Sequence, residues 1–364
     1  MKKDGTYFIG CDKHKRYSNF AVMDEEGRVV EEVRISHEGD QLREYLSSLP
    51  PGSPIAVETS RSWYWFIDLI EECGHIPYLA HAGRAKVMMG HIDKTDKLDS
   101  VGLAKLLRMG TLPVVWIPPR DVRDVRELLR CRMVLSCTRT SVKNRIHATF
   151  SKYGIEVSGV SDLFGVRGRE EAMELLELLP PETRRVQELH FRYLDQLQCH
   201  IEELECRLWE LLSEEEGMRL LKTIPGVGKI LSAVILYEMG DVERFPSAGH
   251  FSAYCGLVPR VYSSGGRTYH GKTRKAACLI LKWAFVEAAN VVSIHHRRWS
   301  YLKVAQVYRK LREKKGHGKA VVAVARRLSC AAWWILKKGE PYREAVRPGE
   351  ESRALREPYE ARGY

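Results

Sequence analysis

The sequence has no paired-cysteine motif and no long apolar run. Its nine cysteines are scattered without a Cys-x-x-Cys spacing, which argues against both a zinc site and a disulfide framework. We interpret them as buried thiols of a cytoplasmic protein. No run of about 18 apolar residues predicts a transmembrane helix, and the N-terminus lacks the apolar segment of a signal peptide. A membrane partner is therefore not expected.

The chain also lacks a balance of charge, because basic residues are in excess. Its 364 residues include 58 Lys and Arg against 47 Asp and Glu, a net charge of +11. This excess favours a polyanionic partner, nucleic acid before a membrane. A basic enzyme without such a partner is an equal alternative on charge alone. The length predicts two or more domains, each with its own core.

The order of expected elements predicts a division of the chain into four parts. These span residues 1–115, 116–217, 218–340 and 341–364. The first has three strands followed by alternating helices and strands, the pattern of an α/β domain. The second has a basic helix over residues 120–152 and another helix over 183–214. The third is mainly helical, and the fourth is a charged tail.

The helix expected over residues 183–214 carries a heptad-like apolar seam. Its members repeat at spacings of three or four and are Leu189, Tyr193, Leu197, Ile201, Leu204, Leu208 and Leu211. Such a seam predicts coiled-coil packing. The partner helix could belong to the same chain or to a second copy, and the sequence favours neither.

Four acidic residues are placed as in a metal-dependent nuclease. Asp12 and Glu58 each end an apolar strand-like run, so they lie side by side if those strands are neighbours. Asp96 and Asp99 share one face of a helix. Converging carboxylates suit Mg²⁺ or Mn²⁺, and two such ions would relieve their mutual repulsion and clamp a phosphodiester. Taken alone, each aspartate is more often a helix cap or a surface charge, so the prediction depends on their joint placement.

A glycine motif, TIPGVGK, lies between two apolar helical patterns at residues 223–229. Its Gly226, Gly228 and Lys229 precede or open a helix, where backbone N–H groups are exposed at the positive end of the helix dipole. This pattern predicts a helix-hairpin-helix element that contacts DNA phosphates and not bases. The spacing differs from that of a P-loop or a dinucleotide fingerprint.

A second basic segment surrounds two serines, Ser263 and Ser264. We expect a flexible turn here, in which nearby cations could activate a serine toward phosphorus. From the residues alone, a phosphate-binding loop is favoured over a nucleophile. The predicted nucleic-acid contacts in this segment are Arg260, Arg267, Lys272, Arg274 and Lys275.

These motifs together resemble those of insertion-sequence family 110 transposases. The strings that contain the four acidic residues, GCDKHK, VETS and KTDKLDS, resemble the DEDD motif of that family. Three later strings resemble its C-terminal transposase domain: IPGVGKILSAVILYEMGDVERF, FSAYCGLVPRVYSSGG and KTRKAACLILKWAFVEAA. The resemblance covers roughly residues 6–290.

The resemblance implies a ribonuclease H-like (RuvC-type) α/β domain, a coiled-coil middle and a mainly helical C-terminal domain with a catalytic serine. The family pattern places this serine before a glycine, at Ser264, with Ser263 as the neighbouring alternative. It also implies a bridge RNA that pairs with donor and target DNA, and assembly as dimers to tetramers. The expected setting is the nucleoid of a prokaryotic cytoplasm.

The resulting hypothesis is a site-specific DNA transposase or recombinase. Asp12, Glu58, Asp96 and Asp99 hold the metal, and Ser264 forms a transient phosphoserine link to DNA. One alternative is a metal-only Holliday-junction resolvase or nuclease, in which Ser264 merely contacts phosphate. A second alternative is a nucleic-acid-binding protein without catalysis.

Overall fold

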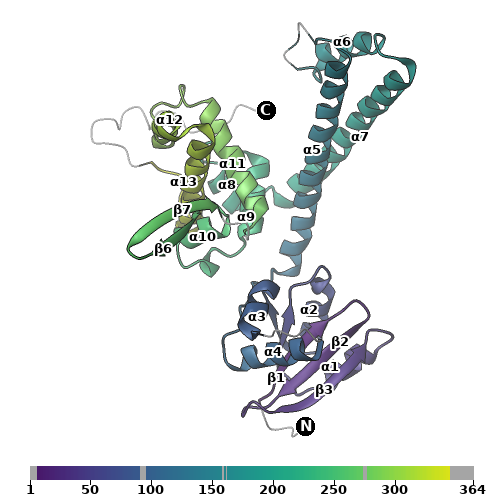
Figure 1. Cartoon of the computed structure of the whole chain (residues 1–364), viewed down its shortest axis with the longest axis vertical. Helices are drawn as coiled ribbons and strands as arrows, with labels where there is room; N and C mark the ends of the chain where they lie inside the picture. The colour runs from purple at the N-terminus through teal and green to yellow at the C-terminus, as the bar shows by residue number, and fades with distance from the viewer. Residues whose placement is uncertain (1–5, 91–95, 158–159, 161, 274–276, 345–364) are drawn as a thin grey trace. The chain divides into compact units, whose positions relative to one another are not determined.

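The computed structural model describes residues 6–90, 96–157, 160, 162–273 and 277–344 (Figure 1). The chain forms two compact units, Met1–Ile117 and Pro118–Tyr364. The first is an α/β domain and the second is mainly helical. The expected α/β domain followed by a mainly helical region is therefore present, whereas the four-part division stays a prediction.

The first unit is built on a mixed five-stranded sheet with strand order β3-β2-β1-β4-β5. The strands are β1 (Phe8–Lys13), β2 (Tyr17–Met23), β3 (Val29–Ser36), β4 (Pro54–Glu58) and β5 (Ile76–Ala80). The first three pair antiparallel, and β4 and β5 continue the sheet parallel to β1. The expected three strands followed by alternating helices and strands are confirmed.

Helices cover both faces of this sheet. They are α1 (Gln41–Ser48), α2 (Trp63–Glu72), α3 (Ala82–Met89) and α4 (Asp96–Arg108). Odd-numbered residues of β1 pack with α1 and α2 in one apolar core. Small residues on the opposite face, such as Ala56 and Ala80, pack with α3 and α4 in another. Side chains alternate between faces along a strand, so each strand contributes to both cores.

Helix α4 lies in direct backbone contact with β1 because the strand has a glycine there. A Cβ added to Gly10 would lie 1.9 Å from the carbonyl oxygen of Ser100 and 2.5 Å from the nitrogen of Ala104. At the other end of α4, Arg108 donates a hydrogen bond to the carbonyl of Glu25, which precedes β3. Glu25 follows the end of β2, which pairs with the start of β1, so the C-terminal end of α4 lies near the start of β1. The helix therefore runs antiparallel to β1, and its N-terminus lies at the edge where β1 and β4 end.

The second unit begins with two long helices that pack side by side, α5 (Arg120–Lys152) and α7 (Pro181–Leu212), with α6 (Val166–Leu176) at their far end (Figure 1). Both long helices were expected; α6 was not. On α7, Leu197, Ile201 and Leu208 of the predicted seam are buried.

Three other residues of that seam are exposed, so only part of the predicted seam packs within the chain, and coiled-coil pairing stays a prediction. Leu189 is 52% exposed, and Tyr193 and Leu211 are each 44% exposed. The face of α7 that packs with α5 includes Phe191 and Leu194, which share an apolar core with Ile146 and Phe150 of α5. An isolated helix sequence cannot say which of two adjacent apolar stripes is covered, because both have helical spacing.

The rest of the second unit is a helical domain with one β-hairpin. Its helices are α8 (Glu216–Leu221), α9 (Lys229–Met239), α10 (Ala248–Tyr254), α11 (Leu279–Ile294), α12 (Lys303–Lys315) and α13 (His317–Lys338), with a 3₁₀ turn η1 (Val242–Arg244). The hairpin strands are β6 (Pro259–Ser264) and β7 (Arg267–Thr273). Leu129 of α5 and Leu208 of α7 belong to the same apolar core, so the long helices are anchored in this domain.

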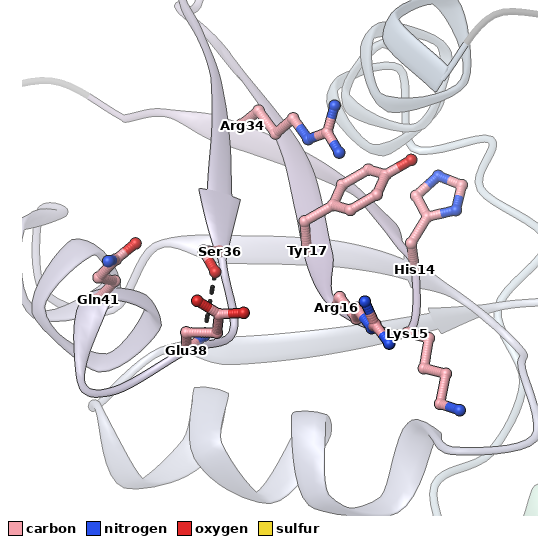
Figure 2. A pocket seen from close by; sticks show the side chains of 8 residues that line it. All are labelled: His14, Lys15, Arg16, Tyr17, Arg34, Ser36, Glu38 and Gln41. Atoms are coloured by element: carbon pink, nitrogen blue, oxygen red, sulfur yellow. Dashed lines mark hydrogen bonds between the residues drawn. The ribbon is translucent and has the colours of Figure 1, made fainter.

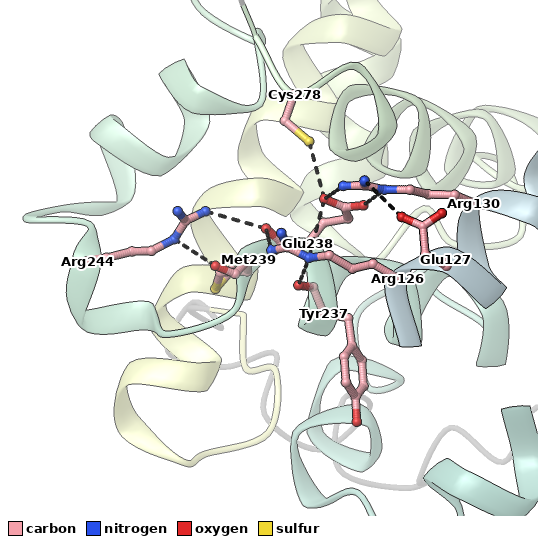
Figure 3. Close-up of polar contacts among 8 residues, drawn as sticks. All are labelled: Arg126, Glu127, Arg130, Tyr237, Glu238, Met239, Arg244 and Cys278. Carbon is pink, nitrogen blue, oxygen red and sulfur yellow. Dashed lines mark hydrogen bonds and ion pairs between the residues drawn. The ribbon is translucent and has the colours of Figure 1, made fainter. Parts of the chain in front are cut away.

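A buried ion-pair network strengthens this anchor (Figure 3). The carboxylate of Glu238 on α9 accepts hydrogen bonds from Arg130 on α5 at 2.8 and 3.2 Å. Arg126, one turn earlier, donates to the carbonyl oxygens of Tyr237 and Glu238 at 2.8 and 3.2 Å. Arg244 donates to the carbonyl of Met239 at 2.8 Å. These contacts satisfy carbonyls at the C-terminal end of α9 that lack helical partners.

The prediction that all cysteines are buried is wrong for four of them. Cys131 and Cys137 on α5, and Cys199 and Cys206 on α7, are exposed. The two long helices bury a narrow stripe against each other, so residues off that stripe face solvent. Among the residues that the structure describes, no helix has the length and apolar character needed to cross a membrane.

Candidate active site

Two of the predicted carboxylates lie at the ends of adjacent parallel strands. In the β1–β4 register, Cys11 pairs with Val57, so Asp12 and Glu58 are the next neighbours. Paired strands are about 4.8 Å apart, and residues beside each other in register point to the same face. Gly10 and Ala56, two residues earlier on each strand, face α4. Asp12 and Glu58 therefore share the α4 face, where both are half-buried.

The other two predicted carboxylates are in the first turn of α4. Asp99 is half-buried and precedes Ser100, whose carbonyl lies against Gly10. Asp96 begins the helix three residues before Asp99, about 4.5 Å earlier along its axis. Asp12 is two residues beyond Gly10, about 7 Å along β1 in the same direction. The backbone positions of all four residues thus lie at one edge of the first unit; the side chain of Asp96 lies outside the described residues.

The residues that follow Asp12 add contacts which the sequence did not indicate. The Nε2 atom of His14 lies 2.9 Å from a carboxylate oxygen of Asp12. Lys13 donates to the Ser62 hydroxyl at 2.6 Å, and partial burial lowers the pKa of this lysine. Burial raises the pKa of the Cys11 thiol, which therefore behaves as a small neutral side chain in the core. The basic residues that directly follow Asp12 in the sequence could have indicated these contacts.

The chemistry of the carboxylate edge fits a hard divalent cation. Its donors are carboxylate oxygens, which accept and cannot donate when ionised, the ligand type that Mg²⁺ and Mn²⁺ prefer. Among the side chains that the structure describes, no group of three or more His, Cys, Asp or Glu is close enough to form a complete metal cluster. The Asp96 side chain is not among them, so the four-carboxylate metal site stays a prediction.

The predicted nucleophile lies at the tip of the β6–β7 hairpin. Ser264 pairs with Arg267, and Ser263 pairs with Thr268. Gly265 and Gly266 connect the strands with φ of 56° and 77°, which suits a two-residue turn. The serines are therefore in a strand, and the expected flexible turn is wrong for them. The Gly-Gly pair between two candidate strands was the overlooked signal.

The pairing also separates the two serines. Residues directly opposite in an antiparallel pair share a face, and successive residues alternate. The hydroxyl of Ser263 lies 3.4 Å from that of Thr268. Ser264 is exposed on the other face, which it shares with Arg267. A guanidinium on the same face as a hydroxyl is suited to stabilise negative charge that develops on phosphate.

The remaining predicted contacts of this segment are only partly described. Arg260 and Arg267 are exposed on β6 and β7. Lys272 belongs to β7, and its side chain lies outside the described residues. Arg274 and Lys275 lie outside them entirely. The role of all five cations as nucleic-acid contacts therefore stays a prediction.

The glycines of the TIPGVGK motif differ in their surroundings. Gly226 has φ of 83°, and an added Cβ would lie 2.3 Å from the carbonyl oxygen of Ala288 on α11. Gly228 precedes α9 and has open space around it. The exposed Lys229 begins that helix. Gly226 thus has a packing reason to be glycine, whereas Gly228 and Lys229 leave the N-terminus of α9 accessible.

Comparison with known proteins identifies the same two regions. Residues 9–155 match the DEDD transposase family model of IS110 type, and residues 218–304 match the model described as "Transposase IS116/IS110/IS902 family". The chain is 25% identical over 334 residues to a transposase for insertion sequence element IS1328 of Yersinia enterocolitica, covering 91% of this chain and 97% of that protein. It is 24% identical to a transposase for insertion sequence element IS1111A of Coxiella burnetii, covering 92% and 91%.

A different kind of relative matches less of the chain. The pilin gene-inverting protein of Moraxella bovis is 27% identical over 153 residues, which covers 40% of this chain and 46% of that protein. Together with the mixed sheet and its carboxylate edge, these matches define a DNA transposase or recombinase of the DEDD class. The chain belongs to the IS110 family of transposases.

Proposed function

We propose that this transposase cleaves and rejoins DNA with two groups of residues: Asp12, Glu58, Asp96 and Asp99 as ligands of Mg²⁺ or Mn²⁺, and Ser264 as nucleophile. The metal-ligand role is supported by the placement of Asp12 and Glu58 on one face at adjacent strand ends, beside the first turn of α4. A bound divalent ion would supply neutralisation of the scissile phosphate.

The role of Ser264 is supported by its exposure at the hairpin tip and by its shared face with Arg267. In the proposed step, its Oγ loses a proton and bonds phosphorus, while one DNA oxygen leaves and takes up a proton as a hydroxyl. A DNA hydroxyl then attacks the phosphoserine bond and restores the serine. One phosphodiester bond is exchanged for another in each step, so no external energy source is needed.

Partners follow from the family and from charge. The relatives are named for insertion sequences and for inversion of a pilin gene, which supports donor and target DNA as substrates. A bridge RNA is proposed from the family resemblance, and the net charge of +11 suits both nucleic acids. Assembly as a dimer or tetramer is supported by the exposed Leu189, Tyr193 and Leu211 on α7.

The test is recombination between donor and target plasmids in cells that carry the whole element with the variant in place of its parental transposase. Asp12→Asn and Ser264→Ala should each abolish recombinant products, and Ser263→Ala should retain them. DNA cutting that continues in Ser264→Ala would support the metal-only nuclease. Unchanged DNA processing in Asp12→Asn would exclude the metal-dependent mechanism and favour a protein that only binds nucleic acid.

A further inference from the structure

A basic pocket lies at the turn between β1 and β2, on the first unit (Figure 2). It has a volume of about 650 Å³. Its lining includes His14, Lys15, Arg16, Tyr17, Arg34 and Glu38. These residues come from the turn itself and from the end of β3, the edge strand beside β2.

The strand register links this pocket to the carboxylates. Asp12 of β1 pairs with Asn19 of β2, and Asn19 pairs with Arg34 of β3. Residues in one such row share a face. Glu58, Asp12, Asn19 and Arg34 therefore form a continuous row on the α4 face, with Arg34 two strands, about 10 Å, from Asp12.

The arginine in this row is held in place by aromatic stacking. The guanidinium carbon of Arg34 lies 3.5 Å from the centre of the Tyr17 ring. The His14 ring stacks on Tyr17 with centroids 4.6 Å apart. A guanidinium ordered by an aromatic ring loses less entropy when it binds an oxyanion.

The backbone of the turn is also fixed. The N–H of His37 donates to the carbonyl of Arg16 at 2.8 Å, and the N–H of His14 donates to the carbonyl of Tyr17 at 2.9 Å. The side chains of His37 and Ser18 are hydrogen-bonded at 2.8 Å. The pocket wall is thus formed before any ligand binds, which favours a recognition site over an accidental cavity.

The lining has more basic than acidic side chains, although His14 lies 2.9 Å from a carboxylate oxygen of Asp12. Among the described residues, Lys15, Arg16 and Arg34 form no ion pair with a carboxylate, and Glu38 is the one acid in the lining. Two other arginines of the unit are paired with carboxylates: Arg28 contacts Asp24 and Glu26, and Arg43 contacts Glu72. The pocket therefore carries net positive charge that suits a phosphate.

We propose that this pocket binds a backbone phosphate of the DNA strand that is processed at the carboxylate edge. The separation of about 10 Å corresponds to roughly three nucleotides along a duplex strand. Arg34 makes the phosphate contact, Tyr17 is a positioning residue for it, and Lys15 and Arg16 add charge at the rim. The inference rests on the proposed function in one respect: DNA must be what the carboxylates act on.

The test is equilibrium binding of a fluorescein-labelled DNA duplex by anisotropy over a series of salt concentrations. All proteins carry Ser264→Ala, so that no strand exchange disturbs the equilibrium. Arg34→Ala and Arg34→Gln should weaken binding and reduce the slope of log affinity against log salt by about 1. Arg43→Ala, on the opposite helix layer, should match the parent.

Variants of Tyr17 test whether the aromatic ring that orders Arg34 contributes to DNA binding, separately from the charge of the arginine. Tyr17→Leu removes the ring under Arg34. It should weaken DNA binding and reduce its salt dependence, as Arg34→Ala does. Tyr17→Phe keeps the ring and should bind as the parent does. Equal losses in both variants would contradict the stacking role.

The proposal is overturned if both Arg34 variants keep the parental salt slope. It is also overturned if they lose affinity for an RNA duplex of the same sequence but not for DNA, since the pocket would then hold RNA. These outcomes are independent of the serine chemistry, because binding is measured in its absence. Recombination by Asp12→Asn would instead contradict the proposed function.

Discussion

Glu238 of α9 and Arg130 of α5 form a two-point ion pair, in which the guanidinium Nε and Nη2 atoms lie 2.8 and 3.2 Å from the two carboxylate oxygens. The side chain of Glu238 is 3% exposed, and its second neighbour, Arg126, is 7% exposed. Burial lowers the pKa of Arg126. The network joins α5 to the C-terminal helical domain through charged groups that are largely excluded from water.

Glu238→Ala should therefore destabilise the second unit strongly. Removal of the carboxylate leaves Arg126 buried without its counter-charge, which costs about 3–5 kcal/mol. Urea unfolding measures the loss. Glu243→Ala is the matched control, because its pair with Lys337 is exposed and contributes at most about 1 kcal/mol. A similar loss in both variants would contradict the special role of the buried pair.

Gly10→Ala should disturb the carboxylate edge through packing alone. The new Cβ would meet the backbone of α4, which must shift at a typical cost of about 1–3 kcal/mol. Thermal unfolding and recombination should both suffer, since the shift moves Asp96 and Asp99 relative to Asp12. Gly318→Ala, in open space on α13, is the control and should be nearly neutral. A Gly10→Ala protein with parental stability would show that α4 does not touch β1 there.

Alanine at Gly226 and at Gly228 should have different effects. Gly226→Ala places a methyl group against Ala288 at a positive φ, so it should lower the melting temperature. Gly228→Ala meets no neighbouring atom and should leave the melting temperature almost unchanged. If the N-terminus of α9 contacts phosphate, Gly228→Ala should weaken DNA binding even though its melting temperature is unchanged. The opposite order of melting temperatures would contradict the packing assignment.

The stability of the first unit should decrease on acidification through His37. Partial burial lowers the pKa of this residue and outweighs the hydrogen bond to the Lys15 carbonyl, which raises it. Nearby Lys13 and His14 lower it further. The unfolded chain binds a proton near pH 6.5, whereas the folded chain resists it, so stability is lost as pH falls below about 6.5. Thermal melts at a series of pH values should show a smaller decrease for His37→Gln. An equal decrease would exclude His37 as a contributor.

Much of the first unit could be predicted from sequence because its signals are local. Alternating apolar runs and turn residues gave the strands, and Asp12 and Glu58 ended two of them. Their adjacency depends on the sheet order, which brings β4 beside β1 and not beside β3. The row from Glu58 to Arg34 depends on register across four strands, which no local pattern specifies.

The second unit shows where local patterns are insufficient. The helix over 120–152 was predicted because its apolar and basic residues keep helical spacing without a breaker. The seam predicted on α7 combines residues that are buried within the chain with the exposed Leu189 and Tyr193, because both sets have helical spacing. The β6–β7 hairpin was read as a loop because its strands are exposed and polar, and they lack the apolar alternation of a covered sheet.

The proposed mechanism is tested most directly by identifying the protein atom that becomes joined to DNA. Reactions with element-end DNA are stopped, digested with protease and nuclease, and examined by mass spectrometry. The account predicts a nucleotide attached to the β6–β7 peptide at Ser264, absent from Ser264→Ala and from Asp12→Asn. Attachment at Ser263 or elsewhere, or recombination by Ser264→Ala without any adduct, would contradict it.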